Sequence, residues 1–309
     1  MRLLVQPDDG VFPVLKAIRK ARRSIDVHIF RLDHRGIEKA LAAAVARGVE
    51  VRTLIAHTNT RGEKGLRKLE QRLLELGATV SRTADDLARY HGKTMIVDGT
   101  WLFVFAFNFT RVDIDRSRSF GIATRKRALV REALRLFEAD FHRKPYTGGA
   151  REFLVSPVNA RERLAVFLKK AKTQLLVYDA CLTDNAMIAL LEDRAKAGVE
   201  LRLIGKVEKG HELRAEPFPG KRQHLRCIVR DGRAAFVGSQ SLRKVELDAR
   251  REIGVLVRDS RVVRAITKVF EADWAETEAG RRQARKEAKQ EGDEPAGRAR
   301  TRQAVAASA

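Results

Sequence analysis

The sequence contains few cysteines and no long apolar run. Its 309 residues include two cysteines, Cys181 and Cys227, which both lie in apolar stretches that we expect to be strands. We expect free, buried thiols there, so neither a disulfide framework nor a cysteine zinc site is indicated. We expect no signal peptide at the N-terminus, and no apolar segment approaches the length of a membrane span. These absences favour a cytoplasmic protein whose contact with membranes is at most peripheral.

Acidic residues are also scarce relative to basic ones. The chain has 62 Lys and Arg against 40 Asp and Glu, a net charge of +22. The segment from Ala279 onward supplies about +4 of this charge, so most of it belongs to the part that we expect to fold. A basic body of this kind indicates a polyanionic partner, either an anionic phospholipid surface or a nucleic acid.

One short motif occurs twice. Each copy has a histidine, a basic residue two positions later, an aspartate seven positions after the histidine, and then a glycine. The first copy consists of His91, Lys93, Asp98 and Gly99, and the second of His224, Arg226, Asp231 and Gly232. We interpret each copy as a strand running into a turn, with the histidine and the basic residue on the same face.

The motif belongs to a larger internal repeat. Residues 48–54 and 198–204 align at an offset of 150, which falls to 133 at the two histidines. The first half therefore carries about 17 extra residues, and a helix at 64–76 is the obvious insertion. The repeat predicts two similar halves, residues 1–146 and 151–276, followed by a basic tail, 277–309. Some helix is expected near 281–290, and disorder in the rest of the tail.

Strands and helices alternate along both halves, which predicts an α/β fold. Helical spacing of apolar residues predicts helices at 9–23, 36–47, 64–76, 127–141, 161–171, 185–197 and 260–274. Apolar or alternating runs predict strands at 24–30, 49–55, 78–81, 91–97, 101–107, 120–123, 174–178, 198–204, 233–237 and 252–257. Residues 110–119, rich in Arg and Asp, are expected to form a loop.

Two histidines and two fixed positive charges form a pocket suited to a phosphodiester. Lys93 and Arg226 can bind the non-bridging oxygens and stabilise transition-state charge. One neutral imidazole can attack phosphorus while the other, protonated, donates to the leaving oxygen. No clustered carboxylates or Cys/His set suggests a metal or another cofactor, so we expect metal-independent chemistry.

These residues resemble the phospholipase D superfamily, which carries a duplicated H-x-K-x4-D motif, a G-S-x-N turn and a later carboxylate. The resemblance covers residues 1–275. It implies an enzyme with a phosphohistidine intermediate and two α/β/α halves packed with pseudo-twofold symmetry, with the site at their junction. Because one chain contains both halves as an internal pseudo-dimer, a monomer would already contain the complete site. Carried over by position, the site residues are His91, Lys93, Asp98, Asn108, His224, Arg226, Asp231 and Glu252, with a turn at Gly238-Ser239.

The chain departs from the family pattern at four places. Arg226 replaces a lysine, Ser241 replaces the second asparagine, and Phe105-Ala106 replaces the first Gly-Ser turn. Ser119 stands where a carboxylate would correspond to Glu252, since each lies 28 residues after its histidine. The predicted site is therefore asymmetric.

This asymmetry suggests separate roles for the two histidines. If Glu252 contacts His224, it stabilises the imidazolium form, so His224 would be the general acid and His91 the nucleophile. Asp113 or Asp115 remains an alternative partner for His91. Asp98 and Asp231 have the opposite strand parity, which favours a turn-stabilising role over a direct chemical one.

Three functions fit these features. The first is a phospholipid enzyme, either a hydrolase of the phospholipase D type or a phosphatidyltransferase of the cardiolipin-synthase type. The second is a metal-independent nuclease, and the third a non-catalytic binder of nucleic acid or membrane with a degenerate site. A row of phenylalanines at 103, 105, 107 and 109 either packs in the core, which is favoured, or lines a lipid-facing rim. Few other aromatic residues are available for stacking on nucleic-acid bases, so we prefer a lipid substrate to a nucleic acid.

Overall fold

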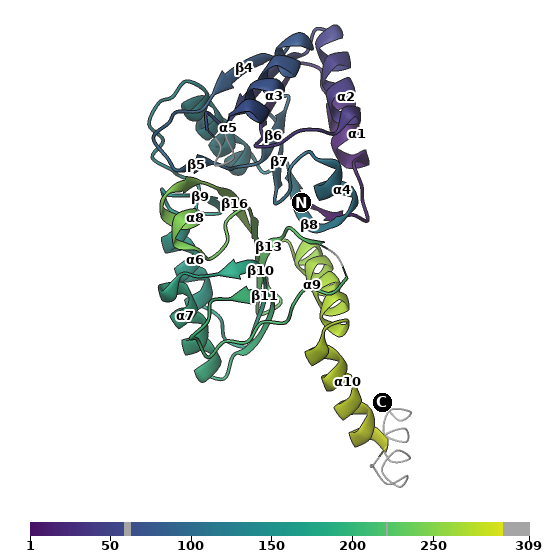
Figure 1. Cartoon of the computed structure of the whole chain (residues 1–309), viewed down its shortest axis with the longest axis vertical. Helices are drawn as coiled ribbons and strands as arrows, with labels where there is room; N and C mark the ends of the chain where they lie inside the picture. The colour runs from purple at the N-terminus through teal and green to yellow at the C-terminus, as the bar shows by residue number, and fades with distance from the viewer. Residues whose placement is uncertain (59–62, 221, 293–309) are drawn as a thin grey trace.

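A computed structural model describes residues 1–58, 63–220 and 222–292 of the chain. Two halves are stacked, and each is built on its own β-sheet (Figure 1). The first half runs from purple to teal at the top of that view, and the second lies below it. Helix α10 (Glu278–Gly292) extends away from both halves.

The first sheet is mixed, with parallel pairing among β2, β3 and β4 and antiparallel pairing among the other main strands. Its strands lie in the spatial order β1 (Arg2–Gln6), β8 (Ser117–Thr124), β7 (Trp101–Phe105), β6 (Thr94–Val97), β2 (Ser24–His28), β3 (Glu50–Ile55) and β4 (Thr79–Arg82).

The second sheet repeats this pattern of pairing among its described strands, except that none corresponds to β4. Its order is β11 (Glu200–Val207), β10 (Gln174–Leu182), β13 (Arg226–Arg230), β14 (Ala234–Gly238), β16 (Ile253–Val257) and β9 (Phe153–Val155). The predicted α/β fold of two similar halves is therefore confirmed.

Helices bury their apolar stripes on both sides of the sheets. Helices α1 (Phe12–Lys20), α2 (Arg35–Ala46) and α3 (Lys64–Glu75) share a core with one face of the first sheet. Helices α6 (Ala160–Lys169) and α7 (Asn185–Lys196) do the same for the second. A third core combines both sheets with α5 (Arg127–Phe141) and α9 (Ser260–Ala275), so the halves are joined by apolar packing.

Two short pairings cross between the halves. Strand β5 (Arg89–Tyr90) pairs in parallel with β15 (Arg250–Arg251), and β12 (Arg222–Gln223) pairs in parallel with the start of β8. Each lies immediately before a motif histidine. The insertion expected at 64–76 is α3, since no helix occupies the described residues between β11 and β12.

Several expectations about local structure were wrong. Strand β6 begins at Thr94 and not at His91, because the backbone of His91 bonds to the other half. The loop expected at 110–119 contains a short helix, α4 (Arg111–Asp115), and its partner in the second half is α8 (Lys244–Asp248). Strands β1 and β9 were also missed, because edge strands this short carry little periodicity.

The structure also differs from the expectations for Cys181 and for the C-terminal tail. Cys227 is a buried free thiol, but free Cys181 is only partly buried, because the pairing of β10 shifts register between Asp179 and Leu182. The tail expected from 277 begins with α10, whereas residues 293–309 lie outside the described chain. Among described residues, no helix is both long enough and apolar enough to span a membrane.

Candidate active site

Each motif histidine is bound at its backbone by the half to which it does not belong. His91 follows β5 and donates its N–H to the carbonyl of Arg251 at 2.7 Å. His224 follows β12 and donates its N–H to the carbonyl of Arg118 at 3.1 Å. The crossing pairs β5–β15 and β12–β8 therefore direct both histidines to the junction of the halves.

The two imidazoles line one cavity of about 340 Å³. Asn108 and Asp113 line it from the first half, together with the polar Thr110. Folding thus brings His91, His224 and Asn108 together, although 133 residues separate the two histidines in sequence. The cavity is lined mainly by polar groups, which suits a charged phosphate rather than an apolar ligand.

The carboxylate partners of the histidines are crossed between the halves. His91 Nδ1 lies 2.9 Å from Glu252 Oε2 and 3.0 Å from Oε1. His224 Nδ1 lies 3.1 Å from Asp113 Oδ2. Because Nδ1 of each ring faces a carboxylate, Nε2 is the ring nitrogen left for chemistry.

The pairing expected from the sequence was therefore wrong. Glu252 contacts His91 and not His224, while Asp113 contacts His224 and not His91. The reason is the crossing pair β5–β15, which places the residue after β15 beside the residue after β5. Asp115 is exposed and does not line the cavity.

Asp113 is held in place by a dense set of donors. Its Oδ2 accepts the backbone N–H of Asn108 at 2.9 Å and the side-chain amide at 2.8 Å, and Arg222 binds Oδ1 at 2.5 Å. Thr110 caps α4 by accepting the Asp113 N–H. His224 and the Asn108 amides hold the pKa of Asp113 well below its usual range, against the effect of burial, so this carboxylate is ionised.

The internal repeat explains why Asp113 was hard to recognise. Its counterpart, 133 residues later, is Glu246, which accepts the Ser241 N–H as Asp113 accepts that of Asn108. Glu246 pairs with Arg250 at 3.2 Å rather than with a histidine. The halves thus supply their carboxylates from different positions.

Three of the departures from the family pattern fit together locally. Ser241 accepts a bond from Arg226 Nε at 3.0 Å, so the smaller side chain accommodates the larger cation. Ser119 donates its hydroxyl to the carbonyl of His224 at 2.6 Å and positions the histidine backbone instead of its ring. The fourth departure, Phe105-Ala106, is fully buried.

Burial governs the ionisation of the histidines. It lowers the pKa of His91 well below the ordinary value, and Lys93 and Arg226 add to this effect. Burial also lowers the pKa of His224 to about 4, although Asp113 acts in the opposite direction. Both rings are therefore neutral at pH 7.

Lys93 and Glu252 are the most deeply buried ionisable side chains beside the histidines. Both side chains are inaccessible to solvent, and Lys93 Nζ donates to the carbonyl of His91 at 2.6 Å. Burial lowers the pKa of Lys93 to about 7, with Glu252 opposing the shift, and burial raises the pKa of Glu252. The ammonium is thus near its titration point at neutral pH.

Gly92 allows the close packing between His91 and Lys93. A Cβ added there would lie 2.5 Å from Ile253 Cδ1 and 2.9 Å from His28 Cε1. Only a residue without a side chain fits between the two halves at this point.

Asp98 and Asp231 do not belong to the site, and their inclusion among the catalytic residues is corrected here. Both have φ of 53° in the turns that follow β6 and β13, at the opposite ends of these strands from the histidines. Asp98 accepts backbone N–H groups of residues 22–24, and Asp231 accepts those of residues 172–174. They hold the first helix of each half to its sheet, which is the turn-stabilising role that their strand parity favours.

Sequence reasoning missed the arginines that line the cavity. Arg89 and Arg222 each stand two residues before a motif histidine, and Arg31 joins them. The repeated R-x-H spacing was a signal that could have identified the first two. Asp33 and Asp113 also line the cavity, so the three arginines leave it with a small net positive charge.

An apolar hollow of about 220 Å³ adjoins this cavity. Both are lined by Phe30, Arg31, Asp33 and Thr110, while Leu66 and Leu69 of the inserted helix α3 line only the hollow. The row of phenylalanines at 103, 105, 107 and 109 is fully buried, so the favoured prediction of core packing is confirmed and the alternative of a lipid-facing rim is excluded. The insertion, not this row, places apolar side chains beside the site.

Within the described ranges, no cluster of three or more His, Cys, Asp or Glu side chains could hold a metal ion.

The chain matches the protein family described as "Cardiolipin synthase, PLD-like domain" over residues 14–141 and 164–274. These two segments make up more than half of the chain, and each contains one histidine motif. No curated protein sequence matches the chain.

Solved structures share the fold. Polyphosphate kinase from Porphyromonas gingivalis has a TM-score of 0.72 at 18% identity, covering 87% of this chain and 49% of its own. The chain thus spans about half the length of that protein. Phosphatidylserine synthase from Haemophilus influenzae Rd KW20 has a TM-score of 0.67 at 10% identity, with coverage of 90% and 86%. Nuc from Salmonella typhimurium, a phospholipase D family member, has a TM-score of 0.41 at 24% identity, with coverage of 46% and 93%.

Proposed function

Given that the chain belongs to the phospholipase D superfamily, we propose that it is a phosphodiesterase or phosphatidyltransferase acting on phospholipids through a phosphohistidine intermediate. The observation that carries this proposal is the pair of imidazoles in one cavity, each facing a carboxylate of the opposite half through Nδ1. This arrangement leaves two Nε2 atoms for one phosphate, one to attack phosphorus and one to transfer a proton.

His91 is proposed as the nucleophile. Its pKa is far below the ordinary value, so the ring is neutral, and its Nε2 lone pair can bond to phosphorus. The bond from phosphorus to the leaving alcohol oxygen breaks as the new N–P bond forms. Glu252 contacts Nδ1 with both oxygens and stabilises the positive charge that the phosphorylated ring acquires.

His224 is proposed as the proton carrier. The ionised Asp113 beside its Nδ1 opposes the lowering of its pKa by burial, and a bound phosphate adds negative charge that favours the imidazolium. Protonated His224 donates to the leaving oxygen in the first step. In the second step, neutral His224 accepts a proton from water or an acceptor alcohol, whose oxygen attacks phosphorus and breaks the N–P bond.

Phosphoenzyme trapping and leaving-group dependence test these roles. We expect His91→Ala to lose activity on both alkyl and p-nitrophenyl phosphodiesters. His224→Ala should lose about 10²- to 10⁴-fold on an alkyl ester but much less on the p-nitrophenyl ester, whose leaving group needs little protonation. Rapid quenching and mass spectrometry should find the phosphoryl group on His91. A phosphoryl group on His224 and not on His91 would reverse the assignment.

The choice of lipid is supported by the apolar hollow beside the cavity. A phospholipid combines a phosphodiester with apolar chains, which matches a basic cavity adjoining a hollow lined by Leu66 and Leu69. Gly65 also lines the hollow, and a Cβ added there would have no atom within 4 Å. A large side chain at this position can therefore fill the hollow without disturbing the histidines.

The variant Gly65→Phe tests the lipid assignment. We expect its KM for phosphatidylglycerol in mixed micelles to rise at least tenfold, with turnover of a small soluble phosphodiester unchanged. Gly65→Ala, which leaves the hollow open, is the matched control and should behave as wild type. Equal lipid kinetics for both variants would remove the hollow from the substrate site.

Nuclease activity is a second candidate, favoured by the three arginines that line the cavity. The protein is incubated in EDTA with phosphatidylglycerol vesicles or with supercoiled plasmid. Headgroup release or cardiolipin formation supports the lipid enzyme, whereas nicking without lipid turnover supports the nuclease. Tight binding with neither reaction points to a non-catalytic binder.

A further inference from the structure

A second basic cavity lies in the second half, at the ends of strands that begin near the histidines. It has a volume of about 490 Å³. Strand β13 runs from Arg226 to Arg230, which lines this cavity, and β16 runs from beside Glu252 toward Arg258, which also lines it. Four residues of strand span about 13 Å, so the cavity is separate from the active site but connected to it by two strands.

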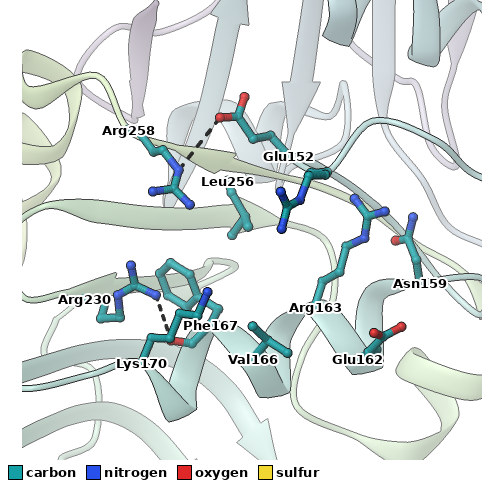
Figure 2. A pocket seen from close by; sticks show the side chains of 11 residues that line it. Glu152, Asn159, Glu162, Arg163, Val166, Phe167, Lys170, Arg230, Leu256 and Arg258 are labelled. Atoms are coloured by element: carbon teal, nitrogen blue, oxygen red, sulfur yellow. Dashed lines mark hydrogen bonds and ion pairs between the residues drawn. The ribbon is translucent and has the colours of Figure 1, made fainter.

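Positive charge dominates this second cavity (Figure 2). Five basic side chains line it from α6, from strand ends and from the segment before β9, namely Arg151, Arg163, Lys170, Arg230 and Arg258. The lining also includes the carboxylates Glu152 and Glu162. Glu152 is already engaged by Lys126 and by Arg258, the latter at 3.8 Å.

Two of the guanidinium groups are fixed by the protein. Arg163 donates to the carbonyl of Ala150 at 2.5 Å, and Arg230 donates to that of Phe167 at 3.1 Å while its guanidinium carbon lies 4.6 Å from the centre of the Phe167 ring. These contacts use only part of the donor capacity of each arginine. Preorganised donors of this kind bind phosphate oxygens well, because little side-chain entropy is lost.

Two further cations of the lining are available to a ligand. Arg151 and Lys170 are exposed, and no described carboxylate forms an ion pair with either. The cavity also has apolar lining from Phe167, Leu256 and the partly exposed Val166, which surround its centre in Figure 2. The lining thus combines several anion-binding groups with a small apolar surface.

The first half shows that the fold does not require this cluster. By the offsets of the repeat, Arg163 corresponds to Pro13 and Arg230 to Val97, and both of these are buried. The correspondence is secured by Asp98 and Asp231, which accept the same backbone N–H groups in the two halves. Lys170 and Arg258 correspond to the basic residues Lys20 and Arg125, so the two frameworks differ in charge at Arg163 and Arg230. These two fixed arginines point to a ligand specific to the second half.

We propose that this second cavity binds a phosphorylated ligand that carries a phosphate monoester or diphosphate next to a short apolar portion. Like charges around one cavity repel each other, and a multiply charged anion relieves this repulsion while accepting bidentate bonds from the arginines. The apolar portion rests against Phe167 and Leu256. The ligand is either a soluble organic phosphate or the headgroup of an anionic phospholipid.

Charge reversal tests the proposal on the full-length protein. Calorimetry with inorganic pyrophosphate should find one more binding site in the wild type than in Arg151→Glu/Lys170→Glu. The matched control is Arg19→Glu/Lys20→Glu, which changes the same number of charges at the end of α1, the helix that corresponds to α6. This control should bind pyrophosphate as the wild type does. Turnover of a small soluble phosphodiester should be unchanged in both variants, which shows that the active site is intact.

Vesicle sedimentation separates the two sources of the ligand. Phosphatidylcholine vesicles with and without phosphatidic acid are compared at constant salt. An at least tenfold weaker binding of the phosphatidic acid vesicles, confined to Arg151→Glu/Lys170→Glu, assigns the second cavity to a lipid headgroup. Unchanged vesicle binding with loss of the pyrophosphate site assigns it to a soluble phosphate. If that variant binds both pyrophosphate and vesicles as the control does, the proposal is overturned.

Discussion

At the scale of single residues, the two copies of the motif have diverged in ways that keep the charge of the site. Arg226 retains the cation of the second copy, and Ser241 provides its hydrogen-bond acceptor. Asp113, in α4 of the same half, supplies the carboxylate that Ser119 lacks. Side-chain identity therefore changed while the electrostatic arrangement around the two imidazoles was maintained.

Lys93 predicts a pH dependence at this scale. Burial lowers its pKa to about 7, so the ammonium that we propose to stabilise the bound phosphate is present below this pH and is lost above it. We expect kcat/KM to fall about tenfold per pH unit above pH 7. The kcat of the bound complex should fall only at higher pH, since the phosphate stabilises the ammonium. Steady-state kinetics between pH 5.5 and 9.5 measure both profiles.

The variant Lys93→Arg is the control for this pH profile. Arginine stays protonated over the whole range, and Arg226 shows that the corresponding place in the other half holds one. We expect lower activity, because the guanidinium has a different geometry, but no decrease between pH 7 and 9. An alkaline decrease that persists in this variant would exclude Lys93 as its origin.

At the scale of elements, the aspartates of the motif stabilise turns. Asp98 lies between β6 and β7 in a left-handed conformation and accepts three consecutive N–H groups at the start of β2. Asp231 does the same between β13 and β14. Each copy of the motif therefore has a histidine for the proposed chemistry before its strand and an aspartate that stabilises the turn after that strand.

The variant Asp98→Ala tests this division. It removes a charged acceptor from several backbone donors, so we expect the free energy of unfolding to fall by about 2 kcal/mol. The kcat/KM of the folded protein should stay within about twofold of wild type. Urea unfolding followed by circular dichroism, together with steady-state kinetics, provides both values.

Asp98→Asn is the matched variant for this turn, because asparagine tolerates the left-handed conformation and keeps one acceptor oxygen. We expect a smaller loss of stability than for alanine. A large loss of kcat in either variant, with the fold intact, would return Asp98 to the catalytic machinery.

At the scale of the whole molecule, the site exists only because the halves are held in register. Arg118, at the start of β8, donates to Asp273 of α9 through Nε and Nη2 at 3.0 Å each. Tyr178 of β10 donates to the same carboxylate at 2.6 Å. The backbone carbonyl of Arg118 also binds His224, so this buried cluster links the contact between the halves to the position of a histidine.

The variant Arg118→Ala is expected to weaken the contact between the halves. Arg118 and Asp273 are both buried, and loss of the arginine leaves a buried carboxylate without its cation, which costs about 3–5 kcal/mol. Asp8→Ala is the control, since Asp8 pairs with the same arginine but is 60% exposed. Asp8→Ala should lower the free energy of unfolding by less than about 1 kcal/mol. Urea unfolding measures both, and equal losses would contradict the interface role.

Much of the fold was predictable from the sequence because its signals are local or repeated. Apolar periodicity reports which segments are helices or strands, and α5 at 127–141 agrees with its predicted range. The doubling of the histidine motif, the offset of 150 and the insertion of α3 are properties of the sequence itself. They predicted two similar halves and identified His91 and His224 as the residues at their junction.

Only the tertiary structure decided how the residues of one half meet those of the other. Spacing along the chain does not show that β5 pairs with β15 or that β12 pairs with β8. The first pairing places Glu252 beside His91, and the second brings His224 to the half that supplies Asp113. It also does not show which side chains gather around a cavity, such as the arginines of the active site or the basic cluster of the second half. The physical reason is that these contacts depend on how distant elements pack in space. Periodicity is set by neighbouring positions, and a repeat is visible by comparing the sequence with itself, so neither depends on that packing.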